Sequence, residues 1–187
     1  LQRFQAADLR LIVRDITSDL GIPTVLAACA EDNVPGFPQA HFGLGTHPDI
    51  RVAAGRALSE LAQSRCVDIQ GVREDISQAD GESAGLIVHT RRVPFIQRRS
   101  WIHAPSPTSR AWRTVASCWN ADILDDIRLM LDRLAAAGIK QAALVDFSVP
   151  DEGIYVVRVI VPGLECWAVD QGRVGMRATS FWRSLAA

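Results

Sequence analysis

Four polar side chains recur along one stretch of this chain at helical spacing. When residues are placed about 100° apart around a helix axis, Arg56, Ser59, Glu60 and Gln63 fall on one flank. A carboxylate and a carboxamide offer the hard oxygen ligands that Mg²⁺ prefers, and a guanidinium pairs with phosphate. The spacing therefore suits a site for a divalent cation and anionic oxygens. A solvated helix face is the competing interpretation.

Arg65 falls on a different side of the same helix. It projects near Leu58 and Leu61, far around the axis from Gln63. On a straight helix Arg65 therefore cannot share a surface with the polar cluster.

The polar cluster requires a long helix, and residues 43–75 predict one. Thr46 and Asp49 have the spacing of a capping box, and Pro48 suits a first turn. Gly71 marks the expected end. Apolar residues recur at helical spacing between these limits, at Ile50, Ala53, Ala54, Ala57, Leu58 and Leu61.

The turn before this helix carries two glycines and a histidine. Gly43 and Gly45 allow either a tight turn or a close approach of backbone to a ligand. His47 is expected to support the turn, and the alternative is that it approaches a phosphate at the helix N-terminus.

Runs rich in Leu, Ile and Val predict strands ahead of the long helix. Leu9–Asp15 and Pro23–Cys29 are expected to pair, because a turn motif at residues 19–21 separates them. Gln39–Leu44 alternates in polarity and predicts a third strand.

The second half of the chain predicts one helix and a hairpin. Apolar residues from Ile123 recur at helical spacing as far as Gly138. Strands at Ala142–Phe147 and Tyr155–Val161 are expected to pair through residues 151–153. The fold class is therefore α/β or α+β, a single domain with a mixed sheet packed against two main helices.

Arg158 stands among aliphatic residues in the last of these strands, on one face with Val156 and Ile160. A lone guanidinium is costly to bury unpaired, so Arg158 is expected to meet a carboxylate or an anionic ligand.

Residues 81–119 form an irregular stretch rich in Arg, Pro and Ser. The functional interpretation is a basic segment that meets a peptide, a partner or phosphates. The alternative, which we favour, is a long surface excursion.

Composition narrows the function classes. The chain has 187 residues, 48% hydrophobic and 22% charged, with a net charge of −1. This balance gives no general attraction to nucleic acid or anionic membranes, and no apolar run approaches a membrane span. We expect a cytoplasmic protein with no nucleic-acid or membrane partner, and a homodimer is possible.

Residues 43–65, GLGTHPDIRVAAGRALSELAQSR, resemble the signature of the YcaO family, in which a glycine-rich turn precedes a helix reading E-x-x-Q-x-R. Two further matches flank this motif in order: DITSDLGIPTVLAA at residues 15–28 and VVRVIVPGLE at residues 156–165. On these motifs the chain is identified as a member of that family, covering the C-terminal portion of its domain.

The resemblance implies an enzyme that uses ATP and Mg²⁺ to phosphorylate a peptide backbone amide oxygen, so that a nucleophile can attack the amide carbon. The products would be azolines, thioamides or amidines. It also implies that Glu60 binds the metal, while Gln63, Arg65 and Arg158 bind the phosphates. Arg56 joins the phosphate-binding set from its position on the helix alone.

The chain departs from the family pattern in two respects. It has no S-x-x-E-x-x-E-R-type motif, so we expect an incomplete ATP site in which these residues alone bind ATP weakly and turn nothing over. Its end, SFWRSLAA, lacks the proline-rich tail typical of peptide cyclodehydratases, which favours thioamide formation with a TfuA-type partner by analogy.

Two other functions are compatible with the sequence. One is a non-catalytic YcaO-like module that docks a partner protein or a leader peptide. The other is a metal-dependent hydrolase that uses Glu60 with Glu31 or Asp32.

Overall fold

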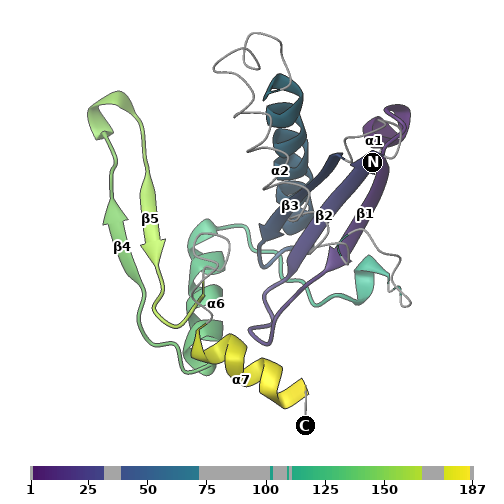
Figure 1. The fold of residues 1–187 in the computed structure, drawn as a ribbon. Coiled ribbons are helices and arrows are strands. Elements are labelled where there is room, and N and C mark those ends of the chain that lie inside the picture. Colours follow the sequence, from purple (N-terminus) through teal and green to yellow (C-terminus); the bar gives the residue numbers. More distant parts are fainter. Residues whose placement is uncertain are drawn as a thin grey trace, which may run out of the picture. The chain divides into compact units, whose positions relative to one another are not determined.

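The computed structural model describes residues 2–31, 39–71, 102, 109, 111–165 and 175–185. The chain divides into two compact units, Leu1–Met130 and Leu131–Ala187. Figure 1 shows the elements of each unit.

The first unit is a three-stranded antiparallel sheet with one long helix against it (Figure 1). The strand order is β1-β2-β3, so β2 is central. The helices and strands of this unit are α1 (Gln2–Ala6), β1 (Arg10–Asp15), β2 (Thr24–Glu31), β3 (Gln39–Thr46), α2 (Ile50–Gly71) and the short 3₁₀ helix η1 (Trp112–Thr114).

The predicted strands and the predicted helix of this unit are confirmed. In the register of β2 against β3, Val25 lies opposite Gly45, and Cys29 lies opposite His41. Because opposite residues share a face, this register places one residue set of each strand toward α2.

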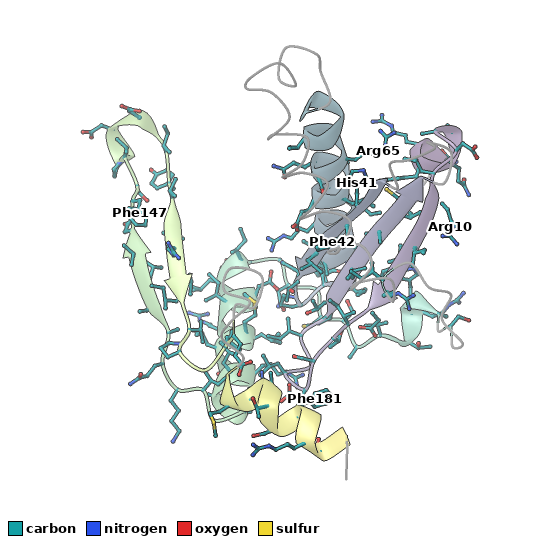
Figure 2. All side chains as sticks on the ribbon, viewed as in Figure 1. Arg10, His41, Phe42, Arg65, Phe147 and Phe181 are labelled. Carbon is teal, nitrogen blue, oxygen red and sulfur yellow. The ribbon has the colours of Figure 1, made fainter. Side chains whose placement is uncertain are left out.

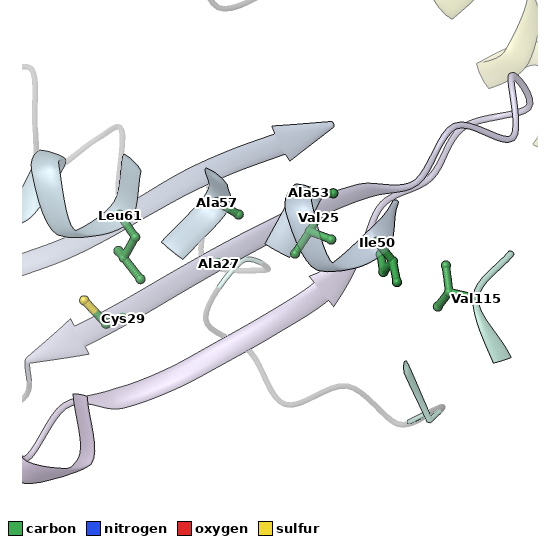
Figure 3. Close-up of a cluster of buried hydrophobic side chains, with 8 residues drawn as sticks. All are labelled: Val25, Ala27, Cys29, Ile50, Ala53, Ala57, Leu61 and Val115. Atoms are coloured by element: carbon green, nitrogen blue, oxygen red, sulfur yellow. The ribbon is translucent and has the colours of Figure 1, made fainter. Parts of the chain in front are cut away.

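The core fills the space between β2 and α2. Figure 3 shows Val25 and Cys29 of β2 on the side of Ile50 and Leu61 of α2. Leu61 is fully buried. The helix therefore packs through its apolar stripe, and its polar flank is left for other contacts.

The opposite face of the sheet is also covered. Leu26 and Ala28 form a second buried cluster with Ile102, which is 2% exposed. The Arg14 side chain donates to the Ile102 carbonyl at 3.2 Å. Ile102 thus anchors one point of the stretch at 81–119 in the core, while most of the arginines of that stretch lie outside the described residues.

The second unit holds a hairpin and a C-terminal helix. The α6 helix (Ile123–Ala136) begins in the first unit and is followed by Gly138, whose φ of 82° ends it as predicted. The predicted hairpin is confirmed as β4 (Ala143–Asp146) paired with β5 (Val157–Ile160), and it turns at Gly153. The remaining elements are η2 (Pro150–Glu152) and α7 (Met176–Leu185).

The fold class with two main helices, α2 and α6, is confirmed. The strands pair antiparallel in both sheets, and the mixed pairing expected from the sequence is not found in the described part of the chain. The short connections between successive strands explain this, since parallel neighbours need a long crossover. Among the described helices, none has the length and apolarity needed to cross a membrane.

The α2 helix begins at Ile50 with Asp49 as its N-cap, one turn later than the capping-box spacing indicates. Thr46 is the last residue of β3, and its hydroxyl bonds that of Thr24 at 3.1 Å. Asp49 is the N-cap, because its Oδ1 accepts the Arg51 N–H at 2.9 Å. The sheet pairing of Thr46 therefore overrides the predicted cap.

The lowered pKa of Asp49 leads us to expect that the stability of the fold depends on pH. The side-chain hydrogen bond from Arg51 holds the pKa of Asp49 below the ordinary aspartate value of 3.8. A carboxylate with a lowered folded pKa stabilises the fold above its unfolded pKa, and this contribution is lost as the pH falls through the folded pKa.

We expect Asp49→Ala to lower the free energy of unfolding by about 1–2 kcal/mol at pH 7, the usual cost of a lost cap. Urea unfolding at pH 7 and pH 3 measures this free energy. The difference in unfolding free energy between wild type and variant should be smaller at pH 3 than at pH 7. Asp132→Ala, on the exposed surface of α6, is the control. An unchanged difference at the two pH values would contradict the assignment.

Candidate functional site

The polar cluster predicted on the helix lies together in one shallow, open hollow of about 730 Å³. The hollow lies between one flank of α2 and the end of β3. Seven residues line it: Leu44, Val52, Gly55, Arg56, Ser59, Glu60 and Gln63. The helical wheel therefore grouped Arg56, Ser59, Glu60 and Gln63 correctly, and these side chains share one surface.

Two members of the cluster also hold the end of β3. The Leu44 N–H donates to Glu60 Oε2 at 3.1 Å, and Arg56 donates to the Thr46 carbonyl at 3.2 Å. Residues four apart on the helix thus meet residues two apart on the strand. The flank of α2 is therefore more than a solvated face, because it orients two of its charges against backbone groups.

These two hydrogen bonds leave other polar atoms of the cluster able to bind a ligand. Glu60 and Arg56 are exposed, and each uses one atom in these bonds. Among the described residues, Glu60 uses Oε2 in its hydrogen bond, and neither its Oε1 nor the Gln63 amide has a described partner. A carboxylate oxygen, an amide oxygen and a guanidinium in one hollow suit a hard cation together with phosphate.

Gly43 and Gly45 serve packing between β3 and α2. A Cβ on Gly43 would overlap the backbone of Ala57 and Leu61, and a Cβ on Gly45 would overlap the carbonyl oxygen of Ala53. Neither glycine has a positive φ. These glycines therefore allow β3 to pack closely against α2. They serve neither the tight turn nor the approach of a ligand that the sequence had suggested.

Arg65 lies away from the hollow, as the helical wheel predicts. Figure 2 shows it on the side of α2 where the sheet lies, in the region of His41. It is half-buried, whereas Gln63 is exposed. The structure therefore separates Arg65 from the four clustered residues on α2.

His47 has a structural role at the start of α2. Its Nδ1 accepts the Asp49 N–H at 3.0 Å, so the proton is on Nε2, which lies 3.3 Å from Asp126 Oδ2. Ser117 Oγ accepts the Ile50 N–H at 3.0 Å. With Asp49 bound to the Arg51 N–H, the first free N–H groups of the helix are used internally, and a phosphate there is disfavoured.

The sequence interpretation missed three residues that line the hollow. Val52 and Gly55 extend it along α2, and Leu44 closes it from β3, another segment. Asp126, which is 6% exposed, also accepts from the Asn120 amide at 2.9 Å. Helical spacing finds residues on one helix, but it gives no information on which strand edge or loop lies beside them.

Arg158 lies on β5, opposite Val145 and in the second unit. It is exposed, and strand alternation places it on one face with Val156 and Ile160, as expected. Its convergence with Glu60 and Gln63 stays a prediction.

The hydrolase alternative gains no support in the part of the chain that the structure describes. That part holds no group of three or more His, Cys, Asp or Glu residues able to bind a metal ion. Asp32 and the side chain of Glu31 lie outside the described residues.

Residues 1–165 match the profile of a family described as YcaO cyclodehydratase, ATP- and Mg²⁺-binding. The chain belongs to the YcaO family. Two relatives align with nearly the whole of this chain. An uncharacterised protein of Methanothermobacter thermautotrophicus is 36% identical over 96% of this chain and 45% of its own. An uncharacterised protein encoded in the tfuA 3′ region of Rhizobium leguminosarum bv. trifolii is 34% identical over 95% of this chain and 42% of its own.

Two solved structures share the fold of this chain. The YcaO protein of Methanopyrus kandleri, bound to AMPPCP and Mg²⁺, aligns over 94% of this chain and 45% of its own, with a TM-score of 0.58 and 23% identity. The heterocyclase TruD aligns over 89% and 22%, with a TM-score of 0.60 and 26% identity. The chain thus spans less than half the length of each of these relatives and structures.

Proposed function

We propose that this chain supplies the Mg²⁺·ATP-binding part of a YcaO enzyme that activates a peptide backbone amide. In that reaction the γ-phosphoryl group of ATP passes to the amide oxygen, and ADP leaves. A nucleophile then attacks the amide carbon, and inorganic phosphate is released. The product is an azoline, a thioamide or an amidine, depending on the nucleophile.

The observation that carries this proposal is the hollow on α2, where Glu60, Gln63 and Arg56 lie together. Phosphoryl transfer depends on positioning and charge neutralisation, so no protein nucleophile is needed. The donor set fits the ion, since Mg²⁺ prefers oxygen ligands and commonly binds through one or two carboxylates plus substrate phosphates.

Each residue of the hollow has a separate role in this proposal. Glu60 would hold Mg²⁺, and the Leu44 N–H orients its carboxylate. Gln63 and Arg56 would bind phosphate oxygens. When bound, the metal neutralises phosphate charge. Arg158 would add a second cation from β5, whereas Arg65 lies outside this hollow and would act from elsewhere.

The whole activity needs more than these residues. The family motif S-x-x-E-x-x-E-R is not in this sequence, so these residues alone should bind ATP weakly and turn nothing over. The tfuA-region relative supports a TfuA-type partner, and with it thioamide formation on a peptide or protein substrate.

Nucleotide affinity tests the proposal through two residues that lie two positions apart. In the full-length gene product that contains this chain, we expect Gln63→Ala to weaken binding of Mg²⁺·AMPPCP about tenfold, because it removes a polar contact to a charged ligand. Arg65→Ala, on the other side of α2, should change the affinity less. Isothermal titration calorimetry measures both.

Absence of Mg²⁺·AMPPCP binding by the unaltered protein would overturn the proposal. A larger loss for Arg65→Ala than for Gln63→Ala would move the site to the opposite side of α2.

A further inference from the structure

The β4–β5 hairpin is two strands wide in the described part of the chain (Figure 1). Its register pairs Val145 with Arg158, and a bridge between Val149 and Ile154 continues that register toward the turn. Because opposite residues share a face and side chains alternate along a strand, every second residue belongs to one face. We call it the Phe147 face, and its large apolar members are Val145, Phe147, Val149, Ile154, Val156 and Ile160.

The Phe147 face is exposed although it is almost wholly apolar. Phe147 is 58% exposed, and the other five apolar side chains are each at least 39% exposed. An isolated two-stranded hairpin is at best marginally stable in water, and it needs further strands or a packed layer on its apolar face. The hairpin therefore requires a covering surface that the described residues do not supply.

The opposite face of the hairpin has the character of a surface in contact with water. Asp146 and Ser148 interrupt its apolar residues, and Tyr155 on this face is 76% exposed. The Asp146 carboxylate accepts the Ser148 N–H at 2.8 Å, and the Ser148 hydroxyl accepts the Val156 N–H at 3.1 Å. Antiparallel sheets commonly pack one face on a core and solvate the other, so the Phe147 face is the one that needs a cover.

Arg158 decides what kind of surface can cover the Phe147 face. It lies within this face, opposite Val145, and no carboxylate belongs to the face. Two copies of the hairpin packed face to face would enclose two guanidinium groups without an anion, which is costly. A second copy is therefore disfavoured, and the covering surface must leave Arg158 an anionic partner.

The two relatives that match nearly all of this chain contain additional sequence that could supply such a surface. They share only 45% and 42% of their own lengths with it. We infer that the Phe147 face is the docking surface for the part of the same gene product that lies outside this chain. That part presents an apolar surface to the six side chains and leaves Arg158 in contact with an anion. This docking does not depend on the proposed function, because burial of apolar surface drives it.

Two neighbouring cysteine variants test this docking in the full-length gene product. Val156→Cys places a thiol on the Phe147 face, and Val157→Cys, the matched control, places one on the opposite face. Val156 and Val157 are 48% and 54% exposed, so without a cover both thiols should react at similar rates. We expect N-ethylmaleimide to label Val156→Cys about tenfold more slowly than Val157→Cys, because the cover restricts access to the thiol. Peptide mass spectrometry separates each new thiol from the four native cysteines.

Equal labelling rates at the two positions would overturn the inference, because the Phe147 face would then be no more covered than its opposite. A rate for Val156→Cys that rises as the protein is diluted would also overturn it, since a second copy would then be the cover. Slow labelling of Val156→Cys at every dilution would support it. No nucleotide takes part in this measurement, so failure of the docking and failure of the proposed function are separate outcomes.

Discussion

Replacing Gly45 by alanine is expected to lower the free energy of unfolding by about 3 kcal/mol, the upper part of the usual range for overpacking. The added methyl group would overlap the carbonyl oxygen of Ala53 and also meet Arg56 Cβ. The first atom is backbone, and Cβ is bonded directly to the backbone, so neither can move aside unless the helix moves. Relief requires β3 and α2 to separate, which would loosen the core around Val25 and Leu61.

Urea unfolding of the variant measures this loss. Gly55→Ala is the matched control, because it makes the same substitution where a Cβ meets nothing described. The two variants should therefore shift the unfolding midpoint in opposite directions. Equal midpoints for Gly45→Ala and the unaltered protein would show that the strand and the helix are less closely packed than the structure has them.

The elements of the first unit could be predicted from the sequence because their patterns are local. The apolar period of α2 and the apolar runs of β1 and β2 each depend on neighbouring residues. The start of α2 was predicted one turn early. The pairing of Thr46 with Thr24 decides that boundary, and this contact joins residues far apart in the chain.

The candidate site was predictable on the helix only. The wheel grouped Glu60 with Gln63 and excluded Arg65, because those relations follow from helical geometry alone. The wall formed by Leu44 was not predictable, since it depends on which strand edge lies beside α2. The role of His47 likewise depended on Asp126, which lies in another element.

The hydrogen bond between Glu60 and Leu44 connects stability with the proposed chemistry. The bond fixes one carboxylate oxygen against a rigid strand, which directs the group before any ligand arrives. The same bond means that truncation of Glu60 would disturb β3 as well as a metal site. A substitution that keeps the bond is therefore needed to separate the two effects.

Glu60→Gln provides that separation. Its amide oxygen can still accept the Leu44 N–H, so the Tm should change little, while the negative charge that would hold Mg²⁺ is lost. In the full-length gene product we expect ATP turnover to fall on the order of 10²-fold or more. Glu60→Ala, which also removes the acceptor, should lower both turnover and Tm. Unchanged turnover in Glu60→Gln would exclude Glu60 as the metal ligand, and an equal loss of Tm in both variants would show that its charge serves the fold.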